Sequence, residues 1–366
     1  MSARSVRASP SFGVRFAPPD VEQTYKLMTA KPKVWVSRPL FPDVLARLAE
    51  HFDVEAEAVE HRHAADELRK KLAGVDAAVV GLADRVDGAV LEGNQRLKVL
   101  ANLGVGYNNL DLDALTRAGI LASNTPEVLT ESVADFAWAL MLAAGRRVGA
   151  AERWLRAGHW PGSNMRFDDW LGLDIHGRTL GILGMGRIGQ GIARRAFGFD
   201  MRVLYHNRSR LPEAMERECH ATLVRKDELL RQSDFLVLVL PFTPENRHAI
   251  GAPELAQMKR SAVLVNVARG GIVDDAALAA ALREGRLAAA GLDVFEGEPS
   301  VHPDLLSLDN VVLSPHIASA SEETRRAMAN LAVDNVIAAM GFGESAGKPP
   351  TPLNPAVMNR WATSKA

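Results

Sequence analysis

Three glycines in the middle of the chain have the spacing of a phosphate-binding turn. The apolar run 180–183 leads into Gly184, Gly186 and Gly189, and apolar residues recur at helical spacing over 188–197. In a strand–turn–helix unit, the first glycine of G-x-G-x-x-G allows a tight turn, the second lets a pyrophosphate approach the backbone, and the third permits close packing. The N–H groups and dipole at the start of the helix favour the phosphates. We therefore predict a dinucleotide site rather than a purely structural turn.

The end of the next strand indicates which dinucleotide binds. NAD sites place an acidic residue about 20 residues beyond the glycines, where it binds the ribose hydroxyls. The corresponding residues here are Asn207, Arg208, Ser209 and Arg210, and none of them is a carboxylate. Two guanidinium groups suit the 2′-phosphate of NADP, so we predict that NADPH is preferred, with NAD as the alternative cofactor. The competing interpretation is that both arginines belong to a solvated loop.

Polar side chains follow three later apolar runs, at the point where each run ends. Arg269 follows 263–267, several carboxylates follow 290–294, and His316 follows the last run. Ligands bind outside the carboxyl ends of strands in an open parallel sheet, so these side chains can converge beside the nicotinamide ring. Taken singly, a histidine here would more often be structural and an arginine would more often be an ion-pair partner. The three groups in this order are more specific.

The motifs that contain these residues resemble those of the D-isomer-specific 2-hydroxyacid dehydrogenases. The glycine turn is followed in order by V-A-R-G-G, G-L-D-V-F-E-G-E-P and S-P-H-I. Two upstream segments, 102–111 and 124–130, belong to the same pattern, and the resemblance covers about residues 33–340. Within the family, the segments H-N-R-S-R and N-T-P-E-V-L-T are most similar to those of the glyoxylate/hydroxypyruvate reductases.

The resemblance implies a role for each polar residue. Arg269 is expected to bind the substrate carboxylate and polarise its carbonyl, and His316 to protonate the carbonyl oxygen as hydride arrives from the nicotinamide. Glu298 is expected to pair with His316, and Asp293 to hydrogen-bond the nicotinamide amide. A carboxylate beside a histidine favours the imidazolium form, which can act as an acid. Chemistry alone would also admit Glu296 as the partner, but the family pattern selects Glu298.

The same resemblance implies further contacts with substrate and cofactor. Backbone N–H groups of Val105 and Gly106 are expected to hold the substrate carboxylate opposite Arg269. Trp160 resembles a tryptophan that reaches the neighbouring subunit's site in glyoxylate reductases, the alternative being a core or interface aromatic. Leu82 and Ala83 are expected to line the pocket wall. The other expected cofactor contacts are Thr130, Arg187, Ile188, Pro241, Val267, Ala268 and Ala318, the last at a position where many relatives have glycine.

The elements between these motifs predict an α/β fold. Short continuous apolar runs alternate with stretches of helical periodicity, which is typical of buried parallel sheets. With the resemblance, this predicts two doubly wound parallel-sheet domains, a Rossmann cofactor domain inserted in a discontinuous flavodoxin-like substrate domain. A long apolar helix over 132–147 is expected between domains or subunits, and a helix over 322–340 is expected to close the substrate domain. The expected strands are 34–36, 77–80, 99–103, 180–183, 203–205, 235–240, 263–267, 290–294 and 311–313.

Domain boundaries follow from the same pattern. The substrate domain is expected to combine 33–131 with 313–345, and the Rossmann domain to span 132–312. Residues 346–366 are expected to form a C-terminal tail. Residues 1–32 are rich in arginine and serine, with no acidic residue before Asp20, and are expected to be a disordered tail. The alternatives are a gene start placed upstream of Met28 or an organelle transit peptide.

Composition limits the other possibilities. A net charge of −1 over 366 residues excludes nucleic-acid binding by bulk electrostatics, and no apolar run is long enough to cross a membrane. The single cysteine, Cys219, fits a cytoplasmic protein. His61 and His63 are expected on a surface turn, and no metal is predicted because no typical ligand spacing occurs. The apolar helix and the region 154–160 are expected to form a homodimer contact.

Three alternative functions remain at this stage. A phosphoglycerate dehydrogenase is disfavoured because the acidic cofactor residue and a regulatory domain are missing. A 2-ketogluconate reductase would differ only in a few loop residues that set the size of the substrate. A dinucleotide-sensing corepressor of the same fold would keep a similar site, since fold alone does not fix function. We expect a reductase of small 2-oxo acids, led by glyoxylate and hydroxypyruvate.

Overall fold

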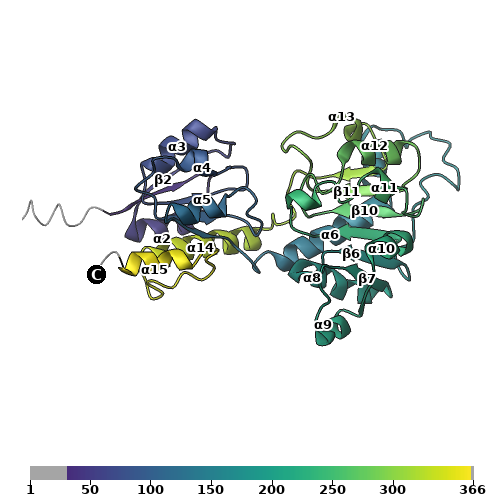
Figure 1. Cartoon of the computed structure of the whole chain (residues 1–366). Coiled ribbons are helices and arrows are strands. Elements are labelled where there is room, and N and C mark those ends of the chain that lie inside the picture. Colours follow the sequence, from purple (N-terminus) through teal and green to yellow (C-terminus); the bar gives the residue numbers. More distant parts are fainter. Residues whose placement is uncertain (1–30, 364–366) are drawn as a thin grey trace, which may run out of the picture.

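The computed structural model describes residues 31–363. The expected N-terminal tail therefore lies almost wholly outside the described residues. Figure 1 shows two lobes, each built on one sheet, and the chain passes from the first lobe to the second and back. No helix among residues 31–363 combines the length and the apolar character that a membrane span requires.

The first lobe contains a five-stranded parallel sheet of flavodoxin-like order. Its strand order is β2-β1-β3-β4-β5, with β2 and β5 at the edges. Helices cover both faces of this sheet, so side chains that alternate along β1 enter two separate cores. Val34 and Val36 lie in one core, and Trp35 lies in the other. The elements are β1 (Lys33–Val36), α2 (Pro42–His51), β2 (Asp53–Ala56), α3 (Ala65–Ala73), β3 (Ala77–Val80), α4 (Gly88–Leu91), β4 (Val99–Asn102), α5 (Leu112–Arg117) and β5 (Leu121–Ser123).

The second lobe contains a seven-stranded parallel sheet of Rossmann order. Its strand order is β12-β11-β10-β9-β6-β7-β8, so the chain reverses direction across the sheet between β6 and β9. The strands are β6 (Thr179–Leu183), β7 (Arg202–His206), β8 (Ala221–Leu223), β9 (Phe235–Leu238), β10 (Val263–Asn266), β11 (Ala289–Leu292) and β12 (Val311–Leu313). The helices are α6 (Thr130–Gly145), α7 (Val148–Arg156), α8 (Arg187–Ala196), α9 (Glu213–Glu218), α10 (Lys226–Gln232), α11 (Ala252–Leu255), α12 (Asp275–Arg283) and α13 (Pro303–Leu306), with 3-10 turns at Phe197–Phe199 and Pro244–Asn246. The predicted α/β fold class, with a Rossmann domain inserted in a discontinuous flavodoxin-like domain, is confirmed.

Two long helices connect the lobes. The apolar helix α6 packs on the seven-stranded sheet and on α8, and the indole N–H of Trp138 donates to the carbonyl of Ile192 at 3.1 Å. Its apolar surface is therefore largely used within the cofactor lobe. Helix α14 (Glu322–Ala339) returns to the first lobe, where Ala332 and Val336 join the core beside β1 and β3. Figure 1 shows α14 alongside α2 and α15 (Ala356–Thr363).

The segment 346–366 is not a free tail over its described part, and this corrects the prediction. Asn354 is buried, its side chain accepts the N–H of Ala122 at 2.8 Å, and it donates to the carbonyl of Ile120 at 3.0 Å. The backbone N–H of Leu353 donates to the carbonyl of Ala122 at 2.8 Å. These bonds occupy the free edge of β5, whose N–H and C=O groups would otherwise lack partners.

Candidate active site

A cleft of about 1010 Å³ lies between the two lobes and collects the polar residues that the sequence motifs singled out. The ends of β10, β11 and β12 form one wall, and the turns after β3 and β4 form the other. Its lining includes most of the expected substrate residues and several that were not expected. They are Leu82, Ala83, Val105, Ile188, Val267, Arg269, Asp293, Glu298, His316 and Ala318 from the predicted set, together with Arg38, Asn108, Phe242 and Arg325.

Arg269 reaches from the second lobe to the glycine turn of the first. Its Nε donates to Asn108 Oδ1 at 3.3 Å, and its Nη1 donates to the carbonyl of Ala268 at 2.7 Å. The guanidinium lies against Gly106, where an added Cβ would come within 1.9 Å of Nη2. No carboxylate among the described residues forms an ion pair with Arg269, although burial lowers its pKa and the more distant Glu298 partly opposes that effect. The cleft therefore contains a partly buried cation without a counter-ion, which suits an anionic substrate.

His316 and Glu298 form the charged pair on the same wall. The His316 Nδ1 lies 2.8 Å from Glu298 Oε2, and both side chains are about one-third exposed. Burial would raise the pKa of Glu298, but the His316 contact and the Phe295 N–H hold it below its usual range. Glu296, the other candidate, instead contacts His248 Nε2 at 2.8 Å and Arg247. The geometry thus places Glu298 beside the histidine.

Asp293 holds the loop that presents His316. It is fully buried, its Oδ1 accepts the Ser314 hydroxyl at 2.7 Å and the Ile317 N–H at 2.8 Å, and its Oδ2 accepts the Ala318 N–H at 2.8 Å. These bonds surround His316, whose φ of 54° is left-handed and uncommon for a residue with a side chain. The sequence motif gave no sign of these bonds, because the groups that donate to Asp293, one hydroxyl and two backbone N–H groups, belong to a different segment.

The glycine turn has open space where phosphates would approach. Gly184 has a φ of +100° and lies under the backbone of Val239 and Leu240, and a Cβ on Gly189 would come within 2.4 Å of the Gly184 carbonyl. Within the described range 31–363, a Cβ on Gly186 would meet nothing within 4 Å, and no side chain caps the N-terminus of α8 there. A tight turn, a close helix and an open, uncapped helix end fit the pyrophosphate of a dinucleotide.

Of the two arginines in the loop after β7, only Arg208 lacks an ion pair with the described residues. Arg210 makes a bidentate pair with Glu216, whose Oε1 also accepts the Tyr205 hydroxyl at 2.6 Å. Arg208 is exposed and has no ion pair among the described residues. Asn207 Oδ1 accepts the Met185 N–H at 2.7 Å, which ties the loop to the glycine turn. Arg208 is consequently the arginine of this loop best able to meet a 2′-phosphate.

Several predicted contacts lie outside the cleft lining. Thr130 begins α6 next to Leu129, which does line the cleft, and Pro241 precedes the lining residue Phe242. Arg187 begins α8 and pairs with Glu127 at 3.0 Å. Ser209 is exposed beside Arg208, and Ala268 is buried behind Arg269. Trp160 is well exposed and does not line this chain's own cleft.

Two lining arginines were not anticipated. Arg325 on α14 is half-buried and forms no ion pair among the described residues, and burial lowers its pKa, as does the nearby Arg38. Arg38 pairs with Glu60 at 2.8 Å. No local sequence signal could have found Arg325, because it enters the cleft only when α14 returns to the first lobe.

One histidine is placed differently from the prediction. His63 is buried, whereas both His61 and His63 were expected on a surface turn. The physical reason is that His63 packs edge-on against Trp35, with ring centroids 5.0 Å apart, and contacts the buried carboxylate of Asp84. His61 is exposed, as expected.

Comparison with known proteins identifies the family. The sequence profile described as D-isomer specific 2-hydroxyacid dehydrogenase, NAD binding domain, matches residues 138–318. A glyoxylate reductase of Thermococcus onnurineus is 48% identical over 331 residues, which cover 90% of this chain and 98% of that protein. The chain therefore belongs to the D-isomer-specific 2-hydroxyacid dehydrogenases, as the motifs indicated.

The other relatives point to the same branch of the family. A glyoxylate reductase of Pyrococcus horikoshii is 46% identical over 311 residues, covering 84% of this chain and 92% of that protein. Among solved structures, the NADPH-dependent glyoxylate/hydroxypyruvate reductase of Sinorhizobium meliloti, in complex with NADP and malonate, is 37% identical with a TM-score of 0.78. That match covers 89% of this chain and 98% of the other chain.

Proposed function

We propose that this protein uses NADPH to reduce small 2-oxo acids, glyoxylate and hydroxypyruvate first, to D-2-hydroxy acids. The observation that carries the proposal is the guanidinium of Arg269, which forms no ion pair with residues 31–363 and lies in the same cleft as the His316–Glu298 pair. Glyoxylate reductases with close to half of their residues identical to this chain support the substrate class.

Arg269 and His316 would divide the chemistry between them. Arg269 binds the carboxylate of the substrate and draws electron density from its carbonyl, with help from the backbone of Val105 and Gly106. Because Glu298 holds Nδ1 of His316, Nε2 remains to donate a proton to the carbonyl oxygen. Bound NADPH supplies the hydride to the carbonyl carbon. Before the transfer, Glu298 stabilises the imidazolium form of His316. After the proton has been transferred, His316 is neutral.

The cofactor would be held by the glycine turn and by the loop after β7. Gly184, Gly186 and Gly189 leave space for the pyrophosphate, and Arg208 would bind the 2′-phosphate with Asn207 and Ser209. This arrangement supports NADPH over NADH. The family's nicotinamide contacts, Asp293 among them, would complete the site.

Initial-rate measurements of NADPH and NADH oxidation with glyoxylate and hydroxypyruvate test the proposal. Fast turnover with a clear NADPH preference would support both the catalytic residues and the loop argument. Turnover with NADH preferred would keep the enzyme class and overturn the role of Arg208. No turnover with either acid would favour a larger substrate such as a 2-ketogluconate. If larger 2-oxo acids also failed, partner capture with and without cofactor would test a sensing role.

The molecule is proposed to act as a cytoplasmic homodimer. Exposed apolar side chains gather around α7 and the segment that follows it, where Trp160 lies. A patch of this kind on a folded protein marks an interaction surface. The proposed cofactor domain spans 132–312, and the proposed substrate domain combines 33–131 with 313–345 and with the described part of 346–366, which packs on β5.

A further inference from the structure

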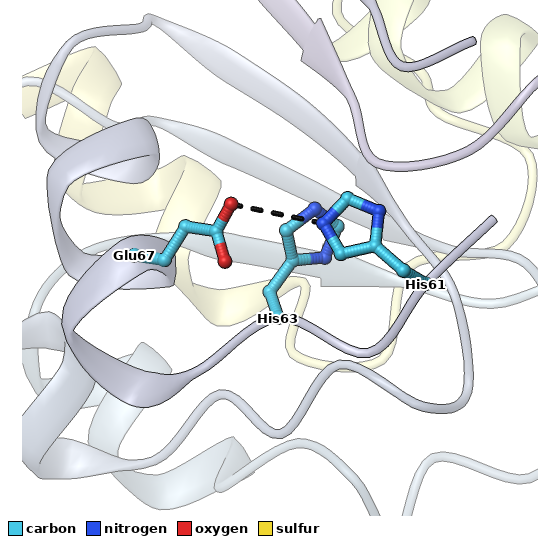
Figure 2. A group of neighbouring side chains, drawn as sticks. All are labelled: His61, His63 and Glu67. Carbon is cyan, nitrogen blue, oxygen red and sulfur yellow. Dashed lines mark ion pairs between the residues drawn. The ribbon is translucent and has the colours of Figure 1, made fainter. Parts of the chain in front are cut away.

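Two histidines and a glutamate lie together at the outer rim of the cleft. His61 and His63 belong to the loop between β2 and α3, and Glu67 lies in the first turn of α3. One ligand atom from each residue lies within 4.8 Å of the other two. Figure 2 shows both imidazole rings next to the Glu67 carboxylate. The active-site groups Arg269 and His316 take no part in this cluster.

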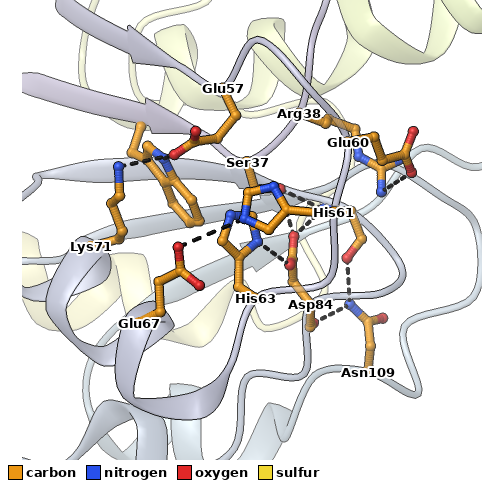
Figure 3. Close-up of polar contacts among 12 residues, drawn as sticks. Ser37, Arg38, Glu57, Glu60, His61, His63, Glu67, Lys71, Asp84 and Asn109 are labelled. Atoms are coloured by element: carbon orange, nitrogen blue, oxygen red, sulfur yellow. Dashed lines mark hydrogen bonds and ion pairs between the residues drawn. The ribbon is translucent and has the colours of Figure 1, made fainter.

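A buried carboxylate orients His63. The Nδ1 of His63 lies 2.8 Å from Asp84 Oδ1, and Asp84 Oδ2 accepts the Ser37 hydroxyl at 2.5 Å and the Gly81 N–H at 3.0 Å (Figure 3). With two other donors already on Asp84, the neutral form of His63 donates its Nδ1–H to this carboxylate. That tautomer leaves the lone pair on Nε2. Metal-binding histidines are commonly held by a carboxylate in this way.

The Nε2 of His63 is unpaired within the part of the chain that the structure describes. The side chain is fully buried, and Nε2 makes no hydrogen bond among the described residues. A buried polar atom without a partner is costly, so its retention here calls for a ligand that reaches it. The groups available beside it are the exposed His61 imidazole and the Glu67 carboxylate.

We propose that His61, His63 and Glu67 bind a divalent transition-metal ion, Zn²⁺ in the first place. Two imidazoles and one carboxylate are a ligand set that zinc accepts, with water in the fourth position. His61 Nε2 and Glu67 Oε1 are 3.7 Å apart, which is long for a hydrogen bond. This distance is close to the separation of about 3.3 Å between two ligand atoms of a tetrahedral ion with bonds near 2.0 Å.

A bound ion would fasten the rim of the cleft. It would join the loop that contains His61 and His63 to helix α3. The neighbouring Glu60 pairs with Arg38 at 2.8 Å, and both residues line the cleft together with His61. The ion would therefore stabilise one wall of the site without taking part in hydride or proton transfer. Without an ion, the exposed His61–Glu67 contact contributes little and leaves Nε2 of His63 unexplained.

Cobalt and zinc binding to the full-length protein, prepared without an affinity histidine tag, tests the site. After removal of metal by a chelator, titration with Co²⁺ should give visible d–d bands that saturate at one ion per chain and disappear when Zn²⁺ is added. His61→Ala and Glu67→Gln, both at exposed positions, should each weaken binding by at least about tenfold. His176→Ala removes an exposed histidine of a distant turn and serves as the matched control.

Thermal unfolding provides the second readout, because an ion that binds only the folded chain stabilises it. Zn²⁺ should raise the Tm of the wild type and of His176→Ala, and at the same concentration should raise the Tm of His61→Ala less. The proposal is overturned if the wild type binds neither ion. It is equally overturned if His61→Ala and Glu67→Gln bind as tightly as the wild type. These results do not depend on whether the protein reduces glyoxylate.

Discussion

Arg269 carries a charge that the described part of the protein leaves unpaired, so its removal should affect the substrate far more than the cofactor. We expect Arg269→Ala to lower kcat/KM for glyoxylate by about 10- to 150-fold, equivalent to the 1.5–3 kcal/mol of a hydrogen bond to a charged group. NADPH binding, followed by the fluorescence of the reduced cofactor, should stay nearly intact. Arg269→Lys keeps the charge but loses the planar fork, and should be intermediate. Loss of both ligands would contradict the assigned role.

Glu298 should act through the histidine that it contacts. Its pKa lies below the usual range, chiefly because His316 contacts it, so the carboxylate is already charged at the pH where a free glutamate would ionise, and its contribution is lost only as the pH falls through that lowered value. Glu298→Gln removes the charge that favours imidazolium. We expect kcat to fall and the pH above which kcat/KM declines to move to lower values.

Glu296→Gln is the matched control for this change. Glu296 pairs with His248 and Arg247 rather than with His316. Its variant should therefore keep the wild-type pH profile of kcat/KM. Identical pH profiles for Glu298→Gln and the wild type would show that Glu298 only packs against His316.

At the scale of the element, the glycine turn permits two substitutions with opposite outcomes. A Cβ at Gly189 would lie 2.4 Å from the carbonyl oxygen of Gly184, so Gly189→Ala should lower the Tm through a backbone clash. A Cβ at Gly186 would meet no protein atom within 4 Å, so Gly186→Ala should fold normally. Because that space is where the pyrophosphate is proposed to lie, Gly186→Ala should instead raise the Kd for NADPH. A normal Kd in Gly186→Ala would place the cofactor elsewhere.

The loop after β7 should set the choice of cofactor. Asn207→Asp combined with Arg208→Ala introduces a carboxylate for the ribose hydroxyls and removes the guanidinium of Arg208. The ratio of kcat/KM for NADPH to that for NADH should therefore fall. Arg210→Ala is the matched control, because Arg210 is already held by Glu216. An unchanged ratio in the double variant, or an equal shift in Arg210→Ala, would show that this loop does not select the cofactor.

The sequence predicted nine of the strands but not β2, β5 and β8, and the reason is physical. All three are edge strands. β2 is largely exposed and contains Asp53 and Glu55, so it lacks the continuous apolar run of a central strand. β5 and β8 have only three residues each, too few for any periodicity. β5 is buried because the distant residues Leu353 and Asn354 cover it, which local pattern cannot show.

The residues of the candidate site also fall into those that the sequence could predict and those that it could not. Residues at strand ends, such as Arg269 after β10 and His316 after β12, could be found because the topology of a parallel sheet brings strand ends together. The clamp formed by Asp293, the cleft position of Arg325 and the burial of His63 depend on contacts between segments far apart in the chain. Such contacts follow from tertiary packing and leave no local signal.

At the scale of the whole molecule, the active site depends on how the two lobes meet. Arg269 belongs to the cofactor lobe, yet its guanidinium contacts Asn108 and lies against Gly106 of the other lobe. The proposed site for the substrate carboxylate is therefore complete only when the lobes approach each other. Closure of this kind would also exclude water from the path of the hydride.

The segment of the chain between α7 and the glycine turn contains exposed apolar side chains. We expect this apolar patch to form the contact between two chains. Phe167 is fully exposed, and Trp160 and Leu171 are 59% and 65% exposed, so this lobe presents large apolar side chains to solvent. We expect the wild type to sediment as a dimer and the double variant Phe167→Glu and Leu171→Glu to sediment as a monomer. Leu306→Glu, at an equally exposed apolar position on α13, should remain dimeric.

The same variants test whether the dimer completes the site. Trp160 is absent from the lining of this chain's own cleft, and by family resemblance it would reach the partner's site. If it does, the monomeric double variant should have a raised KM for glyoxylate, while its NADPH affinity, set by the glycine turn, stays unchanged. Trp160→Ala should raise the same KM in a chain that is still dimeric. A monomeric wild type, or a monomeric variant with an unchanged KM, would remove the second subunit from the mechanism.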